Sequence, residues 1–340
     1  TGVQTCALPI YLPVSHSISL INSGNVLDLT TNMRSIGLVK SATGSAQILH
    51  IDAGMNLYVW DELTSQWINQ SSFDMTTGDG LIADYIGAFS SPEGVTVLAR
   101  YDSLNDLRII SMYYEGELFN IDTPVVQGNN YYSWCLFANG KIYVADFDNL
   151  SSTTTVKVWD YGTYGATGGS WTSLLSHNNS TESYVSILNN NCLYFGFDGD
   201  DVSGVSIIDN NTPFSFPECS VLKFDVSTGA ISSIGTLTMA DDTPWLNDIA
   251  QNTTTGEIYF AGYFTGITDA NSNSITANGI ATYNPTSNTW SAVTDIFNGG
   301  AEDINEVMRA AISPENDILY LSGYFPVVNN SSEIVVRIVL

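Results

Sequence analysis

EIYFAGYFTG, residues 257–266, decides the fold together with GIATYNPTSNTW at residues 279–290. Ile258, Phe260 and the small Ala-Gly pair that follows form an apolar run of the kind that suits a pleated sheet. Between Tyr283 and Trp290 the letters NPTSN predict a tight turn, because proline presets φ and Asn and Ser side chains can cap the local backbone. The two segments therefore predict two strands, a polar loop between them, and the start of a third strand.

Parts of this unit recur along the chain at roughly regular spacing. One anchor is an apolar strand with an aromatic residue, and its aromatics are Tyr143, Tyr194, Tyr259 and Tyr320. The other anchor is an aromatic residue followed by Asp or Asn, at residues 60–61, 159–160, 224–225 and 283–284. Roughly 50 to 65 residues separate the successive tyrosines of the first anchor, which is the size of a four-stranded blade with its loops. No helical period competes, so the sequence predicts an all-β fold, the β-propeller.

We expect a ring of six four-stranded blades, at about residues 31–70, 71–122, 123–176, 177–236, 237–294 and 295–340. The last range holds only three predicted strands, whereas residues 11–30 hold one or two spare strands. Closing the ring removes unpaired sheet edges, so we expect residues 11–30 to complete the last blade. The alternatives are seven blades or a ring truncated at its beginning.

Residues 1–10 are set apart from the predicted domain. Their sequence, TGVQTCALPI, resembles the translation of a sequencing adapter, so we leave it out of the fold argument. We expect residues 11–340 to form a single propeller domain whose native N-terminus is truncated. The lack of a visible signal peptide then carries no information about location.

The charge balance excludes some classes of partner. The chain has 9 Lys and Arg against 35 Asp and Glu, a net charge of −26, which repels nucleic acid and anionic membranes. No apolar run reaches the ~18 residues of a membrane helix. We expect a monomeric domain that binds no nucleic acid and inserts into no membrane. Few Lys, Arg and Cys and many Asn, Ser and Thr are typical of an extracellular or cell-surface protein.

Segments of the repeat resemble a known family. Residues 261–265, 278–284 and 290–293, with a partial copy at residues 322–325, resemble the repeats of kelch and galactose-oxidase-like propellers. Secreted bacterial arrays and fungal cortical polarity-marker ectodomains have the most similar repeats. The resemblance covers residues 221–325 and lacks the double glycine of true kelch repeats. It implies a propeller and little about activity, because propellers host many unrelated functions.

Metal and thiol chemistry find little support in the sequence. No pair among the three histidines has the spacing of metal ligands, which excludes a copper site like that of galactose oxidase. Apart from Cys6, the cysteines are Cys135, Cys192 and Cys219, an odd number that argues against a disulfide framework. Cys192 and Cys219 should begin antiparallel neighbouring strands at opposite ends, too far apart to bridge. We expect three free, mostly buried thiols.

Two groups of acidic residues are candidate sites. An acid stands near the start of four predicted inner strands, and these residues are Asp84, Glu182, Asp248 and Glu306. Inner strands line the central channel, so these acids predict a carboxylate ring at one mouth, with Trp245 as an aromatic platform beside it. A loop after one strand carries the second group, Asp198, Asp200 and Asp201, whose oxygens suit Ca²⁺. For both groups the alternative is solvated surface.

These observations favour binding over catalysis. The leading hypothesis is a non-catalytic extracellular propeller that binds a protein or a glycan through its loop faces, alone or as a module of a larger surface protein. The first alternative is a carboxylate-dependent hydrolase or lyase acting on a glycan, because 35 acids offer many carboxylate pairs. The second alternative is a structural spacer. The expected cofactor is Ca²⁺ or none.

Overall fold

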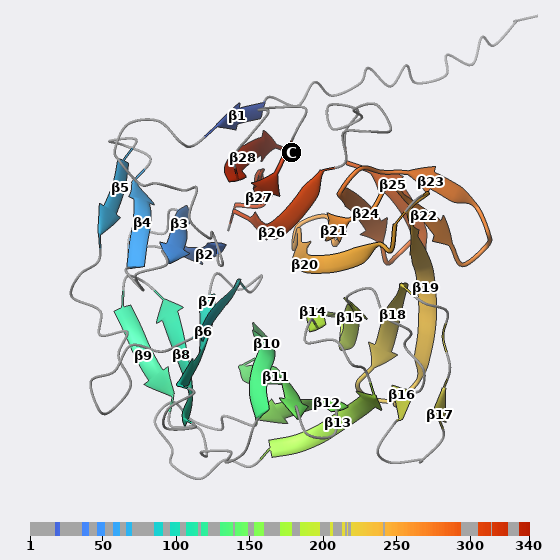
Figure 1. The fold of residues 1–340 in the computed structure, drawn as a ribbon, viewed down its shortest axis with the longest axis horizontal. Coiled ribbons are helices and arrows are strands. Elements are labelled where there is room, and N and C mark those ends of the chain that lie inside the picture. The colour runs from blue at the N-terminus through green and yellow to red at the C-terminus, as the bar shows by residue number, and fades with distance from the viewer. Residues whose placement is uncertain are drawn as a thin grey trace, which may run out of the picture.

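A computed structural model of the chain describes residues 219–293 except 241, 305–325 except 314, and 333–340. Before residue 219 it describes mainly the strands named below. All regular elements within these described residues are β-strands (Figure 1). No helix among them is long and apolar enough to cross a membrane.

The strands follow the chain in antiparallel units of four, each named here by its first strand. The β2 unit contains β2 (Ile36–Lys40), β3 (Ala46–Ile51), β4 (Leu57–Asp61) and β5 (Gln66–Asn69). The β6 unit contains β6 (Tyr85–Ser90), β7 (Thr96–Asp102), β8 (Leu107–Tyr114) and β9 (Glu117–Ile121). The β10 unit contains β10 (Asn130–Ala138), β11 (Lys141–Asp148), β12 (Thr153–Trp159) and β13 (Trp171–Asn178).

The later units follow the same order. The β14 unit contains β14 (Tyr184–Asn189), β15 (Cys192–Phe197), β18 (Ser220–Asp225) and β19 (Ile231–Thr238). The β20 unit contains β20 (Trp245–Gln251), β21 (Ile258–Tyr263), β24 (Ile280–Asn284) and β25 (Thr289–Ala292). The β26 unit contains β26 (Glu306–Ile312), β27 (Ile318–Tyr324), β28 (Glu333–Val339) and the N-terminal strand β1 (Ile18–Leu20).

The first strands of the units surround a common centre (Figure 1). Each of β2, β6, β10, β14, β20 and β26 lies beside the next, and β26 also lies beside β2. This arrangement is that of a β-propeller, and the predicted fold class is confirmed. Hydrogen bonds join the strands into sheets of eight, six, six, four and four, and only the two four-stranded sheets, the β2 and β6 units, coincide with the units of four. The number of blades and their limits therefore stay predictions.

Two short hairpins extend the outer edges of the ring. β22 (Gly266–Asp269) and β23 (Ser274–Thr276) add to β19 of the preceding unit, and β16 (Val205–Ser206) and β17 (Pro213–Phe214) add to β13. The sequence predicted a polar loop where β22 and β23 lie. That expectation is wrong, because a short polar strand is stabilised here by pairing with an edge strand. The side chain of Asp269 shapes the turn by accepting backbone hydrogen bonds from Asn271 and Asn273, both at 2.8 Å.

The aromatic-Asp/Asn anchor has a physical basis in the turn between the third and fourth strands. A carboxylate oxygen of Asp225 accepts hydrogen bonds from the amides two and three residues later, at 2.8 and 3.1 Å. The side-chain oxygen of Asn284 does the same at 2.9 and 3.1 Å. Each turn ends in a left-handed residue, Gly229 with φ 72° and Asn288 with φ 57°. The anchor therefore marks the start of a turn that needs both a capping side chain and a residue tolerant of positive φ.

The Gly-Tyr-Phe motif of residues 262–264 and 323–325 also has a structural cause. β20 bulges between Leu246 and Asp248, and β26 bulges at the matching place. Gly262 and Gly323 lie opposite these bulges, where a Cβ atom would come within 2.1 Å of a backbone carbonyl oxygen. The Phe side chains two residues further, Phe264 and Phe325, are completely buried. The motif thus combines a close backbone approach with a core anchor.

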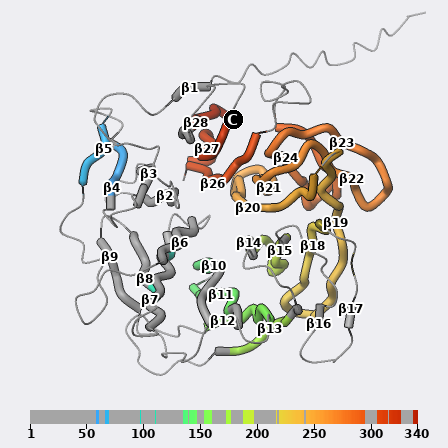
Figure 2. Tube along the Cα trace, viewed as in Figure 1, coloured from blue at the N-terminus to red at the C-terminus, as the bar shows by residue number. Residues whose placement is uncertain are grey.

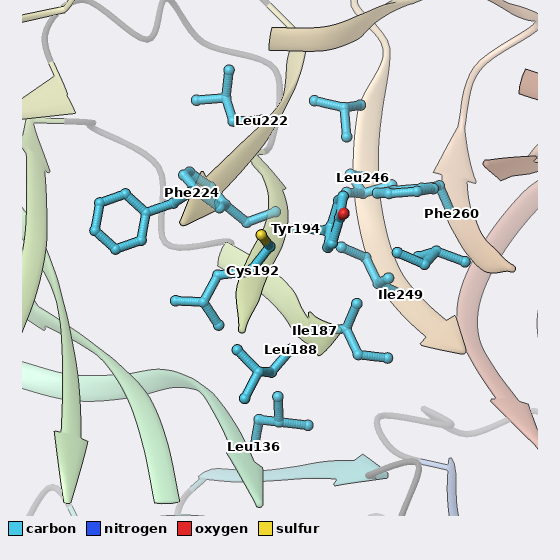
Figure 3. Packing of buried hydrophobic residues seen from close by; sticks show 14 of the residues in the cluster. Leu136, Ile187, Leu188, Cys192, Tyr194, Leu222, Phe224, Leu246, Ile249 and Phe260 are labelled. Carbon is cyan, nitrogen blue, oxygen red and sulfur yellow. The ribbon is translucent and has the colours of Figure 1, made fainter. Parts of the chain in front are cut away.

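Apolar side chains fill the space between neighbouring units. Leu246 and Ile249 of β20 face Ile187 of β14 and Tyr194 of β15, and all belong to one core cluster (Figure 3). The Cα trace in Figure 2 shows β18, β19 and β22 to β24 at the right of the ring and β26 and β27 at its top. Packing of this kind fixes the position of the inner strands.

Trp290 links two neighbouring units. Its ring nitrogen donates a hydrogen bond of 2.9 Å to the carbonyl oxygen of Ile234 on β19, and its ring centroid lies 4.9 Å from that of Phe260. Trp60 occupies a similarly buried place in the β2 unit, at 5% exposure against 6% for Trp290. Among the described residues, the Trp60 ring nitrogen has no hydrogen-bond partner. Both tryptophan rings are buried, but of these two only Trp290 has a hydrogen-bond partner for its ring nitrogen among the described residues. Comparing variants of the two residues therefore distinguishes the contribution of ring packing from that of the hydrogen bond.

We expect Trp290→Phe to lower the free energy of unfolding by about 1–3 kcal/mol, because it leaves the buried carbonyl of Ile234 without its donor. Trp60→Phe keeps the apolar ring and removes no hydrogen bond, so it should cost less. Urea denaturation of the two variants beside the parent protein measures the difference. Equal losses would show that ring volume, not the hydrogen bond, is what Trp290 contributes.

Candidate carboxylate site

Only part of the predicted site can be placed. Trp245, Asp248 and Glu306 are among the described residues, all partly buried. The predicted residues that lie outside the described part of the chain are Asp84 and Glu182 of the channel mouth, and Asp198, Asp200 and Asp201 of the Ca²⁺ loop. Within the described ranges, no group of three or more His, Cys, Asp or Glu side chains could hold a metal ion. The Ca²⁺ expectation stays a prediction.

Asp248 and Glu306 lie at different pairing positions along their inner strands β20 and β26. Glu306 pairs with Tyr324, as Trp245 pairs with Tyr263 in the preceding unit. The equivalent of Asp248 on β26 is Arg309, since both follow the bulge. The two predicted acids therefore occupy different positions of the repeat.

Asp248 lies at the junction of β20 and β26. One carboxylate oxygen accepts a hydrogen bond from the backbone amide of Ile249 at 2.8 Å, and the other accepts one from the amide of Ala310 on β26 at 2.9 Å. Burial raises the pKa of Asp248 from 3.8 to about 6, although the charge of Arg309 and these two amides act in the opposite direction. Asp248 therefore keeps a proton at a pH where an ordinary aspartate has lost it.

Arg309 stands beside this carboxyl group. Its guanidinium donates hydrogen bonds to the carbonyl oxygens of Asn247 at 3.1 Å and Met308 at 2.8 Å. The side-chain amide of Asn247 in turn donates to the carbonyl oxygen of Val307 at 3.1 Å. These bonds join the two bulges and hold the cation at the strand junction. Sequence reasoning missed Arg309, although it is one of only nine basic residues and lies on a predicted inner strand.

Trp245 contacts a second aromatic residue that the sequence analysis did not single out. The rings of Trp245 and Tyr263 are 4.4 Å apart at their centroids and inclined by 31°. Burial raises the pKa of Tyr263, and the nearby charges of Asp242 and Glu306 raise it further. The start of β20 thus combines aromatic surface with carboxylates.

The thiols take no part in this site. Cys135, Cys192 and Cys219 are free and buried, as the sequence predicted. Burial raises the pKa of Cys135, so its reactive thiolate form is suppressed. The thiol of Cys219 donates to the carbonyl oxygen of Pro244 at 3.2 Å. These cysteines are packing residues.

A cavity of about 430 Å³ lies between the β20 and β26 units, away from Trp245. Its lining includes Glu257, Tyr259 and Asp317. A hydrogen bond of 3.0 Å from the Asn252 side chain to the backbone oxygen of Asn316 joins the two units there. The side chains of Asn252, Thr255 and Thr282 on its lining already donate hydrogen bonds within the protein, so we assign no role to this cavity.

Comparisons with known proteins identify the fold alone. No family model matches the chain. No curated protein matches it either. Among solved structures, the chain is similar to an α-L-arabinanase of Penicillium chrysogenum, determined as a complex with arabinobiose. The similarity has a TM-score of 0.52 at 11% sequence identity and covers 93% of this chain and 96% of the arabinanase.

This similarity corrects the leading functional hypothesis. The similar structure is that of an arabinanase, a glycan-hydrolysing enzyme, and it counts against the expectation of a non-catalytic binding module, which we withdraw. The alternative hypothesis, a carboxylate-dependent enzyme acting on a glycan, is better supported. The family resemblance is supported only at the level of the propeller fold.

Proposed function

We propose that this chain hydrolyses a glycan and that Asp248 is the acid that protonates the glycosidic oxygen. The observation that carries the proposal is the pKa of about 6 for Asp248 on an inner strand of the propeller. A general acid must hold its proton near the working pH and release it in the transition state. The similarity to an arabinanase over 93% of the chain supports the same reading.

Glycoside hydrolysis needs a second carboxylate. It acts either as the nucleophile, at about 5–5.5 Å from the acid, or as the base for a water molecule, at about 6.5–9.5 Å. Glu306 is the described candidate, because it lies on β26, the strand against which Asp248 packs. Asp84 and Glu182 are the other candidates. Arg309 is a positioning residue, since its charge lowers the pKa of Asp248 and opposes the effect of burial.

The substrate should be a neutral glycan. A net charge of −26 repels polyanionic chains such as polyuronates and favours neutral polymers. A polymeric substrate also suits the extracellular or cell-surface location expected from the composition. We further propose that the repeat is related to kelch-type repeats, on the strength of the two Gly-Tyr-Phe motifs.

Hydrolysis of arabinan, xylan and mixed-linkage β-glucan, followed by the release of reducing ends, tests this function. We expect kcat/KM to fall about tenfold per pH unit above pH 6, because Asp248 loses the proton that the leaving group requires. Polygalacturonate is the charged control and should be cleaved more slowly. Failure to release reducing ends from every neutral glycan would reject the proposal.

A further inference from the structure

A row of side chains crosses the junction of the β20 and β26 units. Trp245 pairs with Tyr263, Tyr263 pairs with Glu306, and Glu306 pairs with Tyr324. We name these four residues the mouth row. Directly paired residues of antiparallel strands present their side chains on the same face of the sheet. Residues nearly 80 positions apart in the sequence thus form one continuous strip.

Contacts within the mouth row support this placement. The ring centroids of Trp245 and Tyr263 lie 4.4 Å apart, with the two rings tilted by 31°. Glu306 lies near enough to Tyr263 for its charge to raise the pKa of the phenol. Tyr324 is 41% exposed, a large fraction for an aromatic side chain in this fold. The strip therefore offers solvent an aromatic surface with a carboxylate set into it.

The composition of the mouth row selects a class of ligand. A sugar ring has an apolar face of C–H groups and a rim of hydroxyl donors. Aromatic side chains pack against such faces, and a carboxylate accepts hydrogen bonds from hydroxyl groups without competing as a donor. Glu306 and the nearby Asp242 disfavour acidic ligands, because like charges repel.

We propose that the mouth row binds a residue of a neutral sugar chain and guides that chain toward Asp248. The second half of the proposal, guidance toward Asp248, rests on the proposed hydrolase function. Asp248 lies three residues after Trp245 on the same strand. The mouth-row proposal adds Tyr263, Tyr324 and Glu306 as sugar-binding residues and states that the ligand is uncharged.

Binding is measured on the full chain carrying Asp248→Asn, so that ligand is not consumed. The probes for titration calorimetry are arabinobiose, xylobiose and cellobiose, with digalacturonate as the acidic control. We expect at least one neutral disaccharide to bind, and Trp245→Ala and Tyr324→Ala each to weaken it about tenfold through loss of an aromatic contact. Trp245→Phe keeps an aromatic face and should stay close to the parent affinity. Ile68→Ala, at a side chain 45% exposed on β5, is the matched surface control and should change nothing.

The outcomes separate this proposal from the proposed function. Binding that is weakened by both row variants, in a protein that cleaves no glycan, supports the mouth row and rejects the hydrolase. Hydrolysis whose KM and binding constant are unchanged by both row variants rejects the mouth row and keeps the hydrolase. No binding of any neutral disaccharide at millimolar concentration, or tighter binding of digalacturonate, overturns the mouth row. Tyr324→Ala decides the question if Trp245→Ala fails to fold, because Tyr324 is exposed.

Discussion

Asp248→Asn is expected to lower kcat for glycan hydrolysis by about 10²–10⁴-fold, the usual contribution of a positioned general acid. Asn has nearly the same shape and keeps an oxygen that can accept the hydrogen bond from the amide of Ala310, so the strand junction should persist. What the variant loses is the transferable proton. Initial rates on the best neutral glycan measure the effect. Glu257→Gln, at a carboxylate on the lining of the separate cavity, is the matched control and should keep full activity.

The same variant should change how stability depends on pH. The folded-state pKa of Asp248 is raised from 3.8 to about 6, so between these values the native state binds a proton that the unfolded state has released. Asp248 therefore favours folding most below pH 3.8, and this contribution is lost as pH rises to about 6. Asp248→Asn removes this contribution, so the stability of the variant relative to the parent should increase from pH 3.8 to about pH 6.

For the activity prediction, a kcat of Asp248→Asn equal to that of the parent would contradict the role of Asp248 as acid.

Gly262→Ala is expected to destabilise the protein by about 3 kcal/mol or more, at the upper end of overpacking effects. A Cβ at residue 262 would lie 2.1 Å from the carbonyl oxygen of Trp245 and 3.0 Å from the Cα of Leu246. Both contacts are with backbone, which cannot swing aside as a side chain can. The bulge of β20 would have to move, and with it the packing of Leu246 against the β14 unit.

Gly256→Ala is the matched control for this prediction. Gly256 has a φ of 77°, but a Cβ at this residue would meet no atom within 4 Å. Its replacement should cost only the strain of a left-handed alanine, about 1–2 kcal/mol. Urea denaturation of both variants gives the two free energies of unfolding. Equal losses would show that the close approach at Gly262 relaxes without cost.

Structure was predicted best from the sequence where a residue type has a single local role, such as capping a turn or adopting a left-handed conformation. The capping side chains of Asp225 and Asn284 and the left-handed positions after them leave a pattern that a single sequence reveals. The propeller fold followed from such patterns. The prediction of buried thiols followed instead from the odd number of cysteines after Cys6, and Cys135, Cys192 and Cys219 are buried.

Features that depend on register could not be predicted in this way. A bulge adds one residue to a strand and shifts every later side chain relative to its partner. Asp248 and Glu306 each follow an Asn and looked equivalent in the sequence, but the strand pairing matches Glu306 with Trp245, and Asp248 with Arg309. The pairing of β22 with β19 and the position of Arg309 beside Asp248 depend on contacts between distant segments, which leave no periodic signal.

The outer hairpins make each of two units depend on the next. β22 leaves the β20 unit after β21 and hydrogen-bonds to β19, the outermost of the four strands in the β14 unit. β16 does the same from the β14 unit to β13 of the β10 unit. Each hairpin covers the outer edge strand of the preceding unit, so that edge strand cannot open until the hairpin of the next unit has dissociated from it. Local opening, as seen by amide hydrogen exchange, should therefore begin at β23 and β17 and reach β19 and β13 only afterwards.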